Sequence, residues 1–149
     1  MKRIQGFTLV ELIVVLVVLA VVIAVALPAF TAMTERNRLV NSVNLLTMEL
    51  QSARAQAVRH GKSVTITPID NDWSNGWDIE ITDFPNASSM GYPIERVTIE
   101  GPDFVVFEAS GTSLASTAFT LQSGNSETRT ICLTRMGRSE IVPAEEDCQ

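Results

Sequence analysis

The sequence from Gly6 to Phe30 reads GFTLVELIVVLVVLAVVIAVALPAF, and its last 19 residues, from Leu12 onward, carry no charge. An α-helix rises about 1.5 Å per residue, so about 20 apolar residues cross a hydrocarbon core about 30 Å thick. Lys2 and Arg3 precede the stretch, and such basic residues favour the cytoplasmic side of a membrane. The stretch therefore predicts a membrane-spanning helix, with the chain after Phe30 outside the cytoplasm.

Three interpretations of this stretch compete. It resembles a secretory signal peptide, because Ala24-Val25-Ala26 is a small-residue cleavage tripeptide. It also fits a plain membrane anchor, or a signal that is cut on the cytoplasmic side and leaves the apolar run in the mature chain. Glu11 decides between them, because a carboxylate in a membrane span costs about 2.5–3.5 kcal/mol on insertion scales and is usually functional. Only the third interpretation uses it, since a cut after Gly6 creates an amine that a neighbouring copy's Glu11 could neutralise.

The segment Gly6-Phe7-Thr8-Leu9-Val10-Glu11-Leu12 resembles the class III signal of type IV pilins and type II secretion pseudopilins. The resemblance implies cleavage between Gly6 and Phe7 by a prepilin peptidase, N-methylation of Phe7, and charge pairing by Glu11 during assembly. It also implies a single pass through a bacterial inner membrane, with the globular domain in the periplasm and later in a filament. The partners implied are inner-membrane lipid, an inner-membrane assembly platform, and other minor and major pilins or pseudopilins.

The apolar pattern changes after Pro28, which predicts a helix kink because proline removes one backbone hydrogen bond, unless it simply ends the span. Gly61 is expected to cap the helix, which then runs from about Phe7 to His60. Charged and amide side chains, Arg54 and Arg59 among them, fall on the outer faces. One apolar stripe follows spacings of 4, 3, 4, 3 and 4, typical of an amphipathic helix: Leu39, Val43, Leu46, Leu50, Ala53 and Ala57.

From Lys62 onward the apolar pattern has a period of two, and turn-forming residues separate short segments. Tight turns between close strands predict antiparallel sheet, and the polar Asp83–Tyr92 segment is expected to be an exposed loop. The fold class is therefore α+β, with parts 1–6 (leader), 7–30 (membrane or filament-core helix), 31–61 (amphipathic helix) and 62–149 (antiparallel β domain). The expected strands are Ser63–Ile69, Trp77–Thr82, Pro93–Glu100, Phe104–Glu108, Ala118–Gln122, Thr128–Thr134 and Arg138–Val142.

The C-terminal part resembles the domain shared by type II secretion pseudopilin H and FimT/FimU-type minor pilins. The matching pieces, in order, are Ala53–Ala57, Trp73–Trp77, Phe107 with Gly111, and Arg129–Leu133 before Gly137-Arg138. With the N-terminus, the resemblance covers nearly the whole chain and implies a pilin fold. It also implies a structural subunit that helps to initiate or cap a type IV pilus or a type II secretion pseudopilus. The residues leave open which of the two systems it serves.

The chain has two cysteines, Cys132 and Cys148. The N-terminal stretch sends the domain out of the cytoplasm, where a lone pair of cysteines usually forms a disulfide rather than a metal site. We therefore expect these two to be bonded.

The sequence does not favour an enzyme. Its single histidine, His60, has no nucleophile placed beside it by any motif. The aspartates Asp70, Asp72 and Asp78 do not fit a calcium loop and are expected on turns and the surface. Trp73 and Trp77 are expected in the core. No cofactor and no metal site is expected.

DNA binding is the alternative function. Some FimT-like pilins take part in DNA uptake and carry a C-terminal Gly-Arg-x-Arg motif, which the tetrad Gly137-Arg138-Ser139-Glu140 resembles with glutamate in place of the second arginine. Arg135 and Arg138 would be the candidate DNA contacts. The chain has a net charge of −6, and loss of residues 1–6, which hold two basic and no acidic residues, would make it −8. Since phosphate contacts dominate affinity for nucleic acid, this charge disfavours DNA as the main partner.

Overall fold

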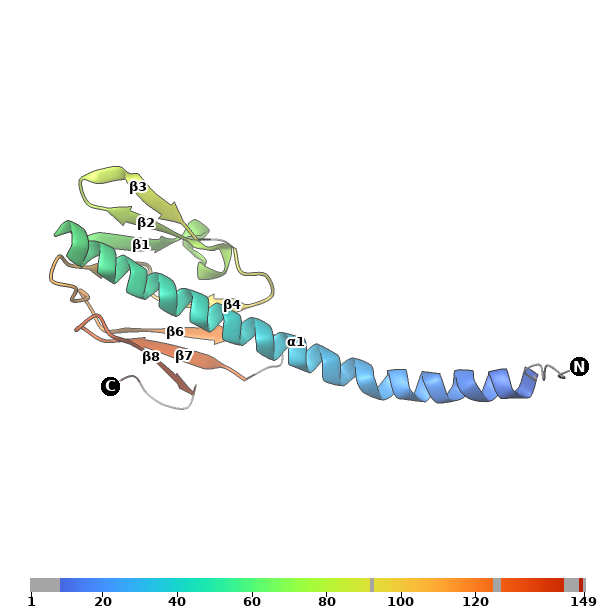
Figure 1. The fold of residues 1–149 in the computed structure, drawn as a ribbon. Coiled ribbons are helices and arrows are strands. Elements are labelled where there is room, and N and C mark those ends of the chain that lie inside the picture. Colours follow the sequence, from blue (N-terminus) through green and yellow to red (C-terminus); the bar gives the residue numbers. More distant parts are fainter. Residues whose placement is uncertain (1–8, 92, 125–126, 144–147, 149) are drawn as a thin grey trace, which may run out of the picture. The chain divides into compact units, whose positions relative to one another are not determined.

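The structure is a computed structural model that describes residues 9–91, 93–124, 127–143 and 148 (Figure 1). The chain divides into two compact units, residues 1–34 and residues 35–149. The helix α1, Leu9–His60, contributes to both. In the described part of the first unit, residues 9–34, the chain is helical throughout.

Helix α1 continues through Pro28 and ends at His60, so Pro28 does not end it. The predicted kink at Pro28 stays a prediction. At the C-terminal end Gly61 adopts a left-handed conformation with φ +61°, and the Lys62 N–H donates to the Ala57 carbonyl at 3.2 Å. A 6→1 backbone hydrogen bond closed over a left-handed glycine is the Schellman motif of helix C-termini. It confirms the predicted end of the helix.

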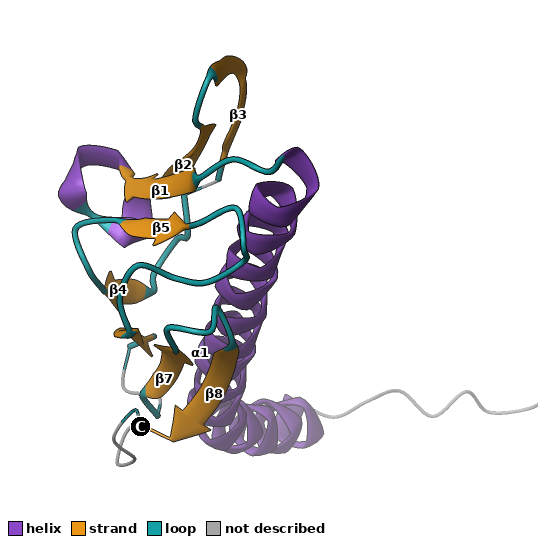
Figure 2. Ribbon diagram, turned by 90° about the vertical axis from the view of Figure 1, so that its left-hand side faces the viewer, coloured by secondary structure: helices purple, strands orange, loops and turns teal. Residues whose placement is uncertain are grey.

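In the described residues, eight strands form two antiparallel sheets that lie along the second half of α1 (Figures 1 and 2). The first sheet has the order β3-β2-β1-β5 and the second β4-β6-β7-β8. Two single-turn 3₁₀ helices, η1 (Ile69–Asn71) and η2 (Trp73–Asn75), connect β1 to β2. The strands are β1 Val64–Pro68, β2 Trp77–Ile81, β3 Phe84–Met90, β4 Thr98–Glu100, β5 Val105–Phe107, β6 Thr117–Gln122, β7 Arg129–Leu133 and β8 Ser139–Pro143.

The expectation of a loop over Asp83–Tyr92 was wrong. The segment contains β3, which pairs with β2, and Tyr92 lies outside the described residues. β3 is an edge strand, where proline is tolerated because one side of the backbone needs no partner. The sequence pattern did not predict β3, because its residues are mostly polar. An edge strand need not alternate apolar and polar residues as a half-buried strand does.

The strand expected over Pro93–Glu100 is also shorter, because β4 begins only at Thr98. Arg96 just before it has φ +62°, a left-handed conformation that a strand cannot contain. The Ile94 N–H donates to the Ser74 carbonyl at 2.9 Å, so this segment follows the η2 turn before it enters the sheet.

The core of the second unit lies between α1 and the two sheets. All six residues of the predicted helical stripe are buried there, which confirms the amphipathic pattern. Trp73 and Trp77 are buried as predicted. The Trp73 ring meets Phe119 edge-on at a centroid distance of 4.8 Å, and its indole N–H donates to the Pro102 carbonyl at 2.8 Å. The helix stripe and both sheets therefore share one core.

Candidate functional site

The first half of α1 exposes its apolar side chains. From Leu9 to Phe30 the large apolar residues are all exposed, and the helix is long and apolar enough to cross a membrane. Glu11 is the acidic residue of its first turn and is exposed. The predicted cleavage and methylation positions, Gly6 and Phe7, lie outside the described residues.

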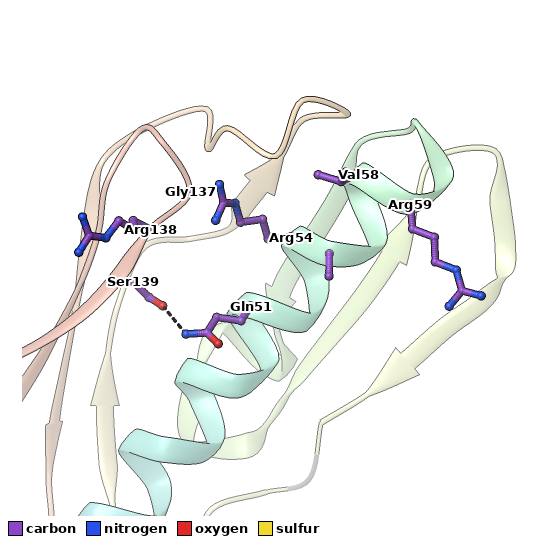
Figure 3. A pocket seen from close by; sticks show the side chains of 8 residues that line it. Gln51, Arg54, Val58, Arg59, Gly137, Arg138 and Ser139 are labelled. Carbon is purple, nitrogen blue, oxygen red and sulfur yellow. Dashed lines mark hydrogen bonds between the residues drawn. The ribbon is translucent and has the colours of Figure 1, made fainter.

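The second unit has a groove of about 630 Å³ between the last turns of α1 and the turn that joins β7 to β8 (Figure 3). Ala55 and Val58 form its apolar part on the helix. It contains three arginines, and none of the described residues that line it is acidic. The lining residues are Gln51, Arg54, Ala55, Val58, Arg59, Gly137, Arg138 and Ser139.

Arg54 connects α1 to two turns. Its Nε donates to the Gly111 carbonyl at 2.8 Å and its Nη2 to the Met136 carbonyl at 3.0 Å. Figure 3 shows Arg54 pointing from the helix toward Gly137. Hydrogen bonds from a charged donor are stronger than neutral ones, so the guanidinium holds both turns against the helix and closes one end of the groove.

Glycine at position 137 makes this packing feasible. Gly137 has φ +72°, and a Cβ there would overlap the Gly111 carbonyl oxygen and lie 2.7 Å from the Arg54 Nε. A side chain would therefore clash with the atoms that form the Arg54 hydrogen bonds. The tight turn is further held by the Gly137 N–H, which donates to the Thr134 carbonyl at 2.8 Å.

Arg138 and Arg59 occupy the two sides of the groove. Both are exposed, and in Figure 3 Arg138 extends from the turn between β7 and β8, whereas Arg59 extends from the helix on the side that faces away from Arg138. Among the described residues, the two ion pairs present involve Lys62 with Asp83 and Arg129 with Glu127, so neither Arg59 nor Arg138 belongs to a described ion pair. The sides of the groove are thus positively charged.

The sequence analysis proposed one of these three arginines, Arg138, as a binding residue and did not propose the other two. Arg138 lines the groove, whereas Arg135 does not. Arg54 and Arg59 were assigned only to outer helix faces. The bond from Arg54 to Met136 spans 82 residues, so no local pattern could have paired them. Glu140, the acidic residue of the tetrad, is exposed on β8, where it pairs with Cys132.

Cys132 and Cys148 form a disulfide with a Cα–Cα distance of 5.4 Å, which confirms that prediction. On β7 the neighbouring Ile131 and Leu133 are buried in the core. Since side chains alternate along a strand, Cys132 points to the other face of the second sheet. The disulfide therefore attaches Cys148 to the face that the helix does not cover.

The histidine and the aspartates considered in the sequence analysis lie at a helix end, on a strand and in turns. His60 is exposed at the end of α1, and Asp78 on β2 is half-buried. Asp70 has φ +53° in a turn, and the Asp72 carboxylate accepts from the Ser74 N–H at 2.8 Å. Over the described part of the chain, no group of three or more histidine, cysteine, aspartate or glutamate side chains could hold a metal ion.

Comparison with known families identifies the second unit. A family profile described as type II transport protein GspH matches residues 42–137. The chain belongs to the GspH family. A second profile, the prokaryotic N-terminal methylation motif, matches residues 1–27 of this GspH-family chain. The two matches lie at the two stretches on which the pilin and pseudopilin resemblance rested.

Solved structures show the same fold. The type IV minor pilin FimU of Pseudomonas aeruginosa PAO1 is 24% identical, with a TM-score of 0.62 over 76% of this chain and 95% of FimU. The minor pseudopilin EpsH from the type 2 secretion system of Vibrio cholerae is 10% identical, with a TM-score of 0.58 over 73% of this chain and 99% of EpsH. At these identities the likeness shows a shared pilin fold. A comparison with curated protein sequences finds no match.

Proposed function

We propose that this GspH-family chain is a minor pilin or pseudopilin, a structural subunit that helps to initiate or cap a type IV pilus or a type II secretion pseudopilus. A prepilin peptidase cuts it after Gly6, and Phe7 becomes the methylated N-terminus. It resides first in the inner membrane, with its folded domain in the periplasm, and then enters the filament through α1.

The observation that carries this proposal is the division of α1 into two halves. Its second half buries a stripe of apolar residues in the domain core, whereas none of the apolar first half is buried. A helix apolar on all sides requires a lipid or protein environment. The methylation motif covers this same half, which supports transfer from lipid into the packed helices of a filament.

In this proposal Glu11 guides assembly by pairing with the N-terminal amine of another subunit. Cleavage after Gly6 would leave a positive charge at the Phe7 amine, four residues before the carboxylate. A charge in an apolar environment is strongly unfavourable unless it is paired. An incoming subunit whose amine meets the Glu11 of a neighbour would satisfy both charges, so correctly placed subunits are favoured over misplaced ones.

Assembly of Glu11 variants tests this proposal. Intact-mass measurement of the membrane-extracted wild-type chain should show loss of residues 1–6 and one methyl group on Phe7. The Glu11→Ala variant should be processed and folded, but its share in the sheared filament fraction, or in the complex with partner subunits, should fall at least about tenfold.

The matched control is Glu49→Ala, which removes a carboxylate from the folded half of the same helix and should assemble as the wild type does. A mature N-terminus at Leu27 would establish the small-residue cleavage site instead and overturn the proposal. Wild-type assembly of Glu11→Ala would show that the charge pair is dispensable.

DNA binding in natural transformation remains the second candidate, and one observation favours it. Arg54, Arg59 and Arg138 line a single groove, which is more positive charge than the sequence tetrad indicated. Two observations oppose it: two of the N–H groups of Arg54 are used on backbone carbonyls, and the chain is strongly acidic.

A further inference from the structure

We propose that the arginine groove is the docking site for a second copy of this chain, which inserts its Glu100–Phe104 turn. The inference deepens the proposed function, because it names a contact between the folded domains of neighbouring subunits. It concerns the groove described above and the connection between β4 and β5.

The turn has the chemistry that the groove requires. Phe104 is 51% exposed, and two residues that precede it in this segment, Glu100 and Asp103, have exposed carboxylates. The groove offers complementary chemistry, because the apolar Ala55 and Val58 line it together with Arg59 and Arg138. An aromatic ring that packs on an apolar surface is a usual interface anchor, and charged groups of opposite sign on the two partners usually form the rim around it.

The turn is also held rigid. Gly101 lies so close to the core that a Cβ there would come within 2.6 Å of the Phe119 ring. The Trp73 indole fixes the Pro102 carbonyl at 2.8 Å. The groove is equally fixed by the Arg54 hydrogen bonds. Two rigid surfaces lose little conformational freedom when they meet, which favours association.

A single copy cannot make this contact with itself. β1 pairs antiparallel with β5, so that Val64 lies opposite Phe107 and Ile66 opposite Val105. The turn before β5 therefore lies at the Pro68 end of β1, whereas the end of α1, which forms the groove, precedes the Val64 end. Since both surfaces are rigid and lie at opposite ends of the strand, the turn in the groove must come from another copy.

Such a contact joins the groove of one copy to the turn of another. The first copy still has a free turn and the second a free groove, so further copies can add at both ends. Contacts of this kind extend into open helical arrays unless the rotation closes a ring. Exposed ion pairs are individually weak, so the contact would act only where α1 already concentrates the copies in a membrane or filament.

Photo-crosslinking of the full chain in reconstituted membranes tests the inference. A benzoylphenylalanine at position 55, inside the groove, should yield a dimer whose crosslinked peptide contains residues 100–104. The same probe at position 82, an exposed position in the turn between β2 and β3, should not yield that peptide. Phe104→Ala should reduce the dimer because it removes the ring from the contact.

Charge reversal gives the decisive comparison. Glu100→Lys with Asp103→Lys should lower the dimer yield about tenfold, and so should Arg59→Glu with Arg138→Glu, because each replaces attraction by repulsion. All four changes in one chain should restore the dimer. Glu80→Lys with Glu95→Lys changes the net charge as Glu100→Lys with Asp103→Lys does, but at positions outside the turn. This control should leave the dimer yield unchanged.

A crosslink that maps to another peptide, or a yield that is insensitive to the charge reversals, would overturn the inference. Retention of duplex DNA at about 0.15 M salt that disappears in Arg59→Glu with Arg138→Glu would instead make the groove a nucleic-acid site. The measurement needs no assembly machinery, so its failure is distinct from failure of the Glu11 assembly test.

Discussion

At the scale of single residues, two glycines with the same backbone conformation have different roles. Gly61 and Gly137 have φ +61° and +72°, which is costly for any residue with a Cβ. The space beside Gly61 is open, whereas Gly137 faces the Gly111 carbonyl and the Arg54 guanidinium. Gly61 therefore only caps the helix, while Gly137 also shapes the groove.

This difference predicts unequal effects of alanine. Gly61→Ala should cost about 1 kcal/mol of unfolding free energy, the left-handed penalty alone. Gly137→Ala should cost about 3 kcal/mol or more, because the new methyl group also displaces the Arg54 hydrogen bonds. Urea titration followed by the fluorescence of Trp73 and Trp77, which are both buried, measures the two costs. Equal losses would show that the groove relaxes without resistance.

At the scale of elements, one helix serves two environments, and one edge strand buries little apolar surface. β8 is an edge strand of the second sheet, and none of its residues is fully buried. Burial of apolar area therefore contributes little to holding it. The bond from Cys148 to Cys132 on the neighbouring β7 adds a covalent link to this edge of the sheet.

Loss of this bond should destabilise the domain. Closing a loop of about 15 residues is worth about 3 kcal/mol by the chain-entropy argument, and the two cysteines are 16 residues apart. Cys148→Ser should lower the unfolding free energy by about that amount in the same urea titration, without burying a new hydroxyl, since Cys148 is exposed. Two thiols open to alkylation in the non-reduced wild-type protein would contradict the bond itself.

At the scale of the whole molecule, net charge limits the partners. The chain carries −6, and the screening length is about 8 Å at physiological salt. Arg138 therefore interacts chiefly with near neighbours such as Glu140, two residues along. The three groove arginines are better matched to a short acidic segment than to duplex DNA, whose charges extend beyond the groove onto an acidic surface.

We therefore expect no micromolar binding of duplex DNA at about 0.15 M salt. A gel-shift titration of the full chain in detergent, at two salt concentrations, measures this. The Arg138→Ala variant should behave as the wild type does. Micromolar binding that weakens steeply with salt and is lost in Arg138→Ala would make DNA uptake the better interpretation.

Much of the architecture follows from local pattern alone. The apolar run after Gly6, the stripe from Leu39 to Ala57 and the glycine at position 61 predicted one helix, because helix formation, amphipathicity and capping depend on residues a few positions apart. Alternation predicted most strands for the same reason. It failed for β3, because an edge strand is held by backbone pairing with β2 and its own side chains need not alternate.

The groove could be decided only by the tertiary structure. Arg54, Gly111, Met136 and Gly137 are brought together by the packing of α1 against two distant turns. The same holds for the position of the Glu100–Phe104 turn at the opposite end of β1. The sequence by itself determined that this chain has a membrane-type helix, an oxidised cysteine pair and an antiparallel domain. Which charges meet on the surface depends on contacts between residues far apart in the chain, and no short-range pattern encodes them.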